Sequence, residues 1–178
     1  MTEANRSSAE LLEDGIRNEC VHLLRQSLDK IDHCVRQLNE AQVWSRPRPE
    51  MNSVGNLMLH LCGNLQQWVV DGVPALPNAR EREAEFQTVG GIPAEELLSR
   101  LKQVVDAAEK SIRAVPTNEW LQAREIQEFD VTVLGAIMHS VPHFVGHTHQ
   151  IVMLTRLALG EEYELHWRPQ NDRSSVPI

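Results

Sequence analysis

The sequence predicts an all-α fold, namely an antiparallel four-helix bundle with a short extended C-terminal tail. Apolar residues recur at steps of three and four in four long stretches, and prolines and glycines interrupt the chain between them. A period of two, typical of a half-buried strand, occurs only in YELHW, where Tyr163, Leu165 and Trp167 share one parity. Long helices joined by short connections pack most simply as an antiparallel bundle.

The first two predicted helices occupy the N-terminal part of the chain. The first is a long amphipathic helix over about residues 9–42, and it ends before Pro47. The second begins at Asn52 or Ser53, either of which can act as the N-cap, and it ends at Gly72. The segment VPALPNARERE that follows is predicted to be a loop, because prolines interrupt it twice.

The other two predicted helices have clear boundary residues. The third opens at Pro93, because proline suits the first helical position, and two glutamates follow in its first turn. It stops before Pro116. The fourth begins near Asp130 or Thr132 and ends at Gly160.

Length and composition fit one folded domain. With 178 residues, 42% of them hydrophobic, we expect a single helical-bundle domain over 1–178, with an ordered core over about 9–167 and a flexible tail over 168–178. The net charge of −8, from 25 acidic and 17 basic residues, repels a phosphate backbone, and no basic patch offsets it. Nucleic acid is therefore not expected as a partner.

The cysteines and the N-terminus indicate the compartment. Cys20, Cys34 and Cys62 are odd in number and form no CxxC, so we expect buried thiols rather than disulfides or a thiolate zinc site. The N-terminus lacks a basic segment followed by an apolar run, and no apolar stretch approaches the roughly 20 residues that span a bilayer. We expect a cytoplasmic protein with no membrane partner.

Histidines mark the candidate site. His139, His143 and His147 recur at intervals of four, and such residues project from nearly one face of a helix, so two imidazoles can reach one metal ion. Pro142 removes a helical hydrogen bond and is expected to kink the helix, which favours the pair His143 and His147 and leaves His139 as an accessory residue. The bundle core can bring His60 of the second helix to the same point.

The second helix carries a polar stripe that includes His60. Asn56, His60, Asn64 and Gln67 follow one another at about four-residue spacing on a helix that is otherwise largely apolar. Buried polar groups need hydrogen-bond partners, so we expect this stripe to line a polar cavity. A metal-bound histidine also needs a partner for its second ring nitrogen, and the candidates are Asn56, Asn64 and Gln150.

These motifs resemble the DinB/YfiT-like superfamily. HFVGHTHQIVMLTR is similar to the H-xxx-H-x-x-Q-I signature of that family, and SVGNLMLHLCGNLQQWV is similar to the helix that supplies its first histidine. The similarity extends over most of the chain and includes REREAEF and LALGEEYELHW. Two positions depart from the pattern, His149 and Pro142. The resemblance implies a four-helix bundle, often a homodimer, with one divalent metal held by His60, His143 and His147.

A three-histidine site predicts metal-dependent chemistry. Three neutral imidazoles leave coordination positions open, where an ion can lower the pKa of bound water or bind a thiolate. Imidazole ligands suit zinc, nickel, copper or iron, so the donor atoms alone do not choose the metal. We expect zinc or nickel, with manganese or iron as further candidates. There is no HExxH, because Phe144 and Val145 follow His143. The resemblance implies a hydrolase, or a transferase that uses a low-molecular-weight thiol, acting on a small molecule. The alternative is a non-catalytic metal-binding bundle with a role in sensing, storage or assembly.

The remaining polar candidates have simpler expected roles. Arg80, Arg82 and Arg156 can bind an anionic group, but ion pairs at the surface are the expected use. Trp68 and Trp120 are expected in the core or an interface.

Overall fold

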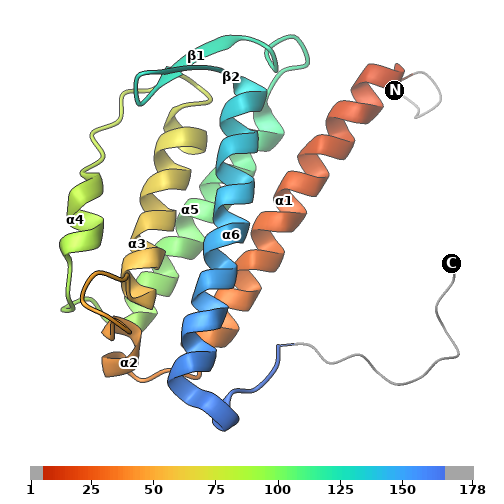
Figure 1. The fold of residues 1–178 in the computed structure, drawn as a ribbon. Coiled ribbons are helices and arrows are strands. Elements are labelled where there is room, and N and C mark those ends of the chain that lie inside the picture. The colour runs from red at the N-terminus through yellow and green to blue at the C-terminus, as the bar shows by residue number, and fades with distance from the viewer. Residues whose placement is uncertain (1–5, 167–178) are drawn as a thin grey trace, which may run out of the picture.

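The computed structural model describes residues 6–166, which form a mostly helical fold with one small β-hairpin (Figure 1). Its elements, in chain order, are α1 (Ser8–Val35), α2 (Glu40–Trp44), α3 (Val54–Leu65), the π-helical segment η2 (Gln66–Asp71), α4 (Arg82–Gln87), α5 (Ala94–Ala114), β1 (Ala123–Ile126), β2 (Phe129–Thr132), α6 (Val133–Leu159) and the 3₁₀ turn η3 (Gly160–Glu162).

The predicted first helix was too long. It ends at Val35, and the separate short helix α2 begins after Asn39. The Asn39 side chain accepts a hydrogen bond from the backbone N–H of Gln42, and the Gln42 side chain accepts one from the N–H of Asn39. This reciprocal cap defines a new helix start. The apolar periodicity continues through Leu38 and concealed the break.

The predicted starts of the second and fourth helices are confirmed. Ser53 caps α3 and Thr132 caps α6, each accepting a hydrogen bond from a backbone N–H three residues later. The α3 helix continues into η2, and Gly160, with φ of 57°, ends α6. Pro142 lies within α6, which is one uninterrupted helix from Val133 to Leu159. The α5 helix begins directly after Pro93 and ends before Pro116.

The all-α prediction missed the hairpin of β1 and β2. The strands pair antiparallel, with Ala123 opposite Thr132 and Ile126 opposite Phe129. The turn residues Gln127 and Glu128 have φ of 52° and 65°, a conformation that glycine and asparagine adopt more readily. Because neither of these residue types occurs in the turn, the hairpin could not be predicted from turn residues. The hairpin covers the N-terminal end of α6 (Figure 1).

Two further predictions concern short segments. The loop prediction for VPALPNARERE holds up to Glu81, and α4 then begins at Arg82. The predicted extended tail forms no strand over 163–166, and the rest of it, 167–178, lies outside the described residues.

The core lies between the long helices. Helix α1 packs against α5 and α6, and α3 packs against α4, α5 and α6 (Figure 1). Helix α5 contributes an apolar face to this core, with Leu97, Leu101 and Val105 buried. No described helix is both long enough and apolar enough to cross a membrane. The position of α3 between α4 and α6 is what assembles the site.

Candidate metal centre

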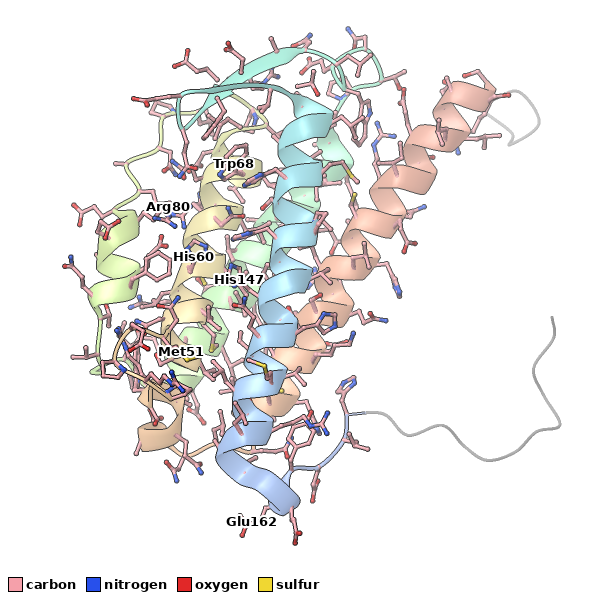
Figure 2. The ribbon with its side chains drawn as sticks, in the orientation of Figure 1. Met51, His60, Trp68, Arg80, His147 and Glu162 are labelled. Atoms are coloured by element: carbon pink, nitrogen blue, oxygen red, sulfur yellow. The ribbon has the colours of Figure 1, made fainter. Side chains whose placement is uncertain are left out.

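Three of the predicted histidines come together between α3 and α6. One ring nitrogen from each of His60, His143 and His147 lies within 4.8 Å of the others. His60 Nε2 and His143 Nε2 are 3.0 Å apart. His60 is buried, whereas His143 and His147 remain partly exposed. Figure 2 shows His60 and His147 facing the space between the two helices, with ring centroids 5.1 Å apart.

These nitrogens fit a single ion. A zinc ion binds imidazole nitrogen at about 2.0–2.1 Å, so two such ligands at a tetrahedral angle lie about 3.3 Å apart. The 3.0 Å between His60 Nε2 and His143 Nε2 is close to that spacing. The three histidines therefore lie close enough to hold a metal ion.

The protonation of the histidines also suits a metal. Burial, together with the neighbouring His147 and His60 imidazoles, lowers the pKa of His143 to about 4. Burial likewise lowers the pKa of His147, although its hydrogen bond to Gln150 acts in the other direction. Metal binding requires neutral imidazole, and these two rings are neutral at pH 7 without a metal. Binding therefore displaces no proton from them.

A carboxylate from α4 orients His60. The Nδ1 of His60 lies 2.9 Å from Glu85 Oε2. A His60 ring that offers Nε2 to an ion carries its proton on Nδ1, which then donates to Glu85. Arg80 Nη2 is also 3.0 Å from Nδ1, but in this tautomer both are donors, so that contact is no hydrogen bond. A carboxylate behind a metal-binding histidine fixes the ring and strengthens it as a ligand.

Arg80 keeps Glu85 ionised. Its guanidinium approaches both carboxylate oxygens, with Nε 2.6 Å from Oε1 and Nη2 2.8 Å from Oε2. Burial raises the pKa of Glu85, but the hydrogen bonds from Arg80 and His60 outweigh it and leave the pKa below its ordinary value. The expectation of a surface ion pair was wrong for Arg80, whose side chain is only 5% exposed. The pair is part of the site.

Gly63 makes room for this ion pair on α3. A Cβ atom at this position would lie 2.0 Å from Glu85 Oε1 and 2.7 Å from Arg80 Nε. Both distances are far below van der Waals contact, so any larger residue displaces the pair. Gly63 is three residues from His60 and therefore lies on the same side of α3.

The three predicted hydrogen-bond partners have different positions. Gln150 accepts a hydrogen bond from His147 Nδ1, at 2.8 Å. The Asn56 amide donates instead to the backbone carbonyls of Glu85 and Thr88 and so ties α4 to α3. Asn64 accepts a hydrogen bond from Ser140 Oγ and thereby joins α3 to α6.

His139 lies beside the three-histidine group and not within it. Its ring stacks on Trp68, with centroids 3.9 Å apart, and lies nearly parallel to His143 at 5.9 Å. Burial lowers the pKa of His139. His149, the histidine that departs from the family pattern, is exposed on the opposite side of α6.

Sequence reasoning missed Glu85. REREAEF contributes three glutamates between the two histidine-bearing helices, and only α4 selects the one that faces His60. The available signal was an acidic residue and an arginine close together in a segment that the family resemblance already included.

The chain has the fold of a DinB-like protein, as the resemblance implied. The chain belongs to the family described as "Protein of unknown function (DUF1572)", whose model matches residues 15–172. A conserved protein from Enterococcus faecalis has a similar structure, with a TM-score of 0.65 and 18% identity over 80% of this chain and 96% of that one. A DinB-like protein from Bacillus cereus follows, with a TM-score of 0.57 and 13% identity over 76% and 90%. A search of curated proteins found no match.

Proposed function

We propose that this protein is a divalent-metal-dependent enzyme, either a hydrolase or a transferase that uses a low-molecular-weight thiol. The observation that supports it is the group of three imidazole nitrogens within 4.8 Å, one ring buried and two partly exposed. Three protein ligands with an open position are typical of catalytic zinc sites, whereas structural sites use four. Among the described residues, no fourth histidine, cysteine or carboxylate joins this group.

The protein's own residues hold and orient the proposed ligands. Glu85 fixes His60 through Nδ1, and Gln150 fixes His147 through Nδ1. Both bonds leave the Nε2 of the ring free for an ion. When bound, a divalent ion would act as a Lewis acid that polarises a substrate oxygen or lowers the pKa of a coordinated water or thiol.

Glu85 has a positioning role in this proposal. Its two oxygens are occupied by His60 and by the guanidinium of Arg80, and its low pKa makes it a weak proton acceptor. It therefore holds the proton of His60 in place and does not take a proton from the nucleophile. This agrees with the absence of HExxH, in which a glutamate acts as the base.

The proposal includes the assembly and location of the protein. We propose an antiparallel four-helix bundle that forms a cytoplasmic homodimer. Met153 and Leu157, one turn apart on α6, are 49% and 67% exposed, and such a pair gains stability when a second subunit covers it. Light scattering coupled to gel filtration tests the dimer, and Leu157→Glu should yield a monomer.

Elemental analysis of tag-free protein tests the metal, which we expect to be zinc or nickel, or else manganese or iron. We expect about one equivalent in the wild type and loss of the metal in His60→Ala and in His143→Ala. The exposed His149→Ala is the matched control and should retain it. With the metal identified, thiol transfer and hydrolysis are assayed on the loaded protein. Stoichiometric metal without turnover would favour the non-catalytic alternative, and absence of metal would refute both.

A further inference from the structure

A second feature of the molecule lies next to the histidine group. It is a pocket of about 420 Å³ between η2, β2 and the first half of α6. Its volume lies within the range of small-molecule sites. Most of its lining is apolar or aromatic, and the main contributors are Trp68, Phe129, Val131, Met138, His139 and Asp130. Figure 2 places Trp68 on the side of His60 that faces the hairpin.

Stacked rings connect this pocket to the candidate metal centre. His139 lines the pocket and stacks on Trp68, with centroids 3.9 Å apart and planes inclined by 23°. His139 also lies beside His143, with ring centroids 5.9 Å apart and planes inclined by only 14°. A molecule in the pocket is therefore about one helical turn from the proposed ligand His143.

The lining indicates the chemistry of the occupant. Phe129 is 61% exposed and Met138 is 50% exposed, so a flat apolar group placed against them removes their surfaces from water. Asp130 is the only charged side chain of the lining, and it disfavours an anion. The pocket thus suits an apolar aromatic or branched aliphatic group that carries no negative charge.

We propose that this pocket, shared between η2, β2 and α6, is the specificity subsite of the metal centre and takes the uncharged apolar group of a small substrate. This inference rests on the proposed function, because the reacting group of the same substrate would lie at the metal. It also gives the hairpin a role, since β2 supplies Phe129 and Asp130.

Two hydroxamic acids test the proposal on zinc-loaded protein by calorimetry. Acetohydroxamic and benzohydroxamic acid share one metal-binding group, but only the second carries an aromatic arm. We expect benzohydroxamic acid to bind about tenfold more tightly, the factor for partial burial of one ring. Because the two acids also differ in intrinsic acidity, the decisive quantity is how their affinity ratio changes in variants.

Phe129→Ala and Met138→Ala should each lower that ratio severalfold while leaving the affinities for zinc and for acetohydroxamic acid unchanged. Both side chains are exposed, so neither substitution threatens the fold. Leu12→Ala, an equally exposed apolar position on α1, is the control and should leave the ratio as it is. A 4-carboxylate on the aromatic arm should weaken binding, and Asp130→Asn should restore part of it.

The outcomes separate the two proposals. A protein that binds no zinc overturns both the function and the subsite. If the protein binds zinc but neither Phe129→Ala nor Met138→Ala changes the affinity ratio of the two acids, the subsite alone is overturned. Zinc binding with no affinity for either acid shows that no open position exists, and this also removes the subsite.

Discussion

Glu85→Gln is the sharpest perturbation of the site. The substitution keeps the size of the side chain and a carbonyl acceptor for His60 Nδ1, but it removes the charge that the low pKa of Glu85 maintains. Losing a carboxylate partner of a metal-bound histidine typically weakens metal affinity about 10–100-fold, or about 1.4–2.7 kcal/mol. We expect the dissociation constant for zinc to rise by this factor.

The same substitution also acts on the metal-free protein. Arg80 would remain buried without a countercharge, and an unpaired buried charge is destabilising. The retained Gln acceptor limits the loss, so we expect the free energy of unfolding to fall by up to about 3 kcal/mol.

Two measurements and one control test this reasoning. Zinc affinity is measured by competition with a chromophoric chelator, and stability by urea unfolding of the metal-free protein. Glu83→Gln is the matched control, because the Glu83 side chain on the same helix is 78% exposed. It should change neither quantity. If Glu85→Gln is folded and its zinc affinity is within twofold of wild type, the negative charge of Glu85 does not strengthen His60 as a ligand, which contradicts the prediction.

Gly63→Ala should displace Glu85 and Arg80 and so weaken zinc binding about as much as Glu85→Gln does. The control is Gly15→Ala, in open space on α1, which should leave zinc affinity unchanged. Chelator competition measures both affinities. The metal-free protein should lose stability as the pH falls from about 6.5 to about 4. The pKa of His143 is about 4 in the folded protein against an ordinary 6.5, so over this range His143 stays neutral in the folded state while it takes up a proton in the unfolded chain. Urea unfolding gives the free energy of unfolding of wild type and of His143→Gln, and we expect the difference between them to shrink by about 1–2 kcal/mol over this pH range, allowing for partial exposure. An unchanged difference would contradict the lowered pKa of His143. Ser53→Ala removes the cap of α3 and should lower the free energy of unfolding by about 1–2 kcal/mol, and thermal denaturation that shows no loss would contradict the capping role.

Much of the fold could be read from local signals. Ser53 and Thr132 carry the side chains that cap a helix, and Gly160 carries the backbone freedom that ends one. Where a local signal conflicted with periodicity, the prediction failed, as it did at Asn39. The hairpin was missed because Gln127 and Glu128 adopt a turn conformation that their side chains do not favour.

Some residues of the site could likewise be predicted from local signals, and others depend on tertiary packing. His143 and His147 were predicted from helical spacing, and His60 from its place on a largely apolar helix together with the family resemblance. Glu85 could not be selected, because its contact with His60 depends on how α4 packs against α3. The role of Gly63 depends on the same packing, since the residue acts by leaving space. Tertiary contacts of this kind leave no periodic trace in a sequence.

A crystal structure of the zinc-loaded, tag-free protein, with an anomalous difference map at the zinc edge, tests the central claim most directly. We predict one peak at about 2.0–2.1 Å from a ring nitrogen of His60, His143 and His147, with Glu85 still bonded to His60 Nδ1 and the remaining position free of protein atoms. A peak at another place, or His139 as a fourth ligand closing the site, would contradict it.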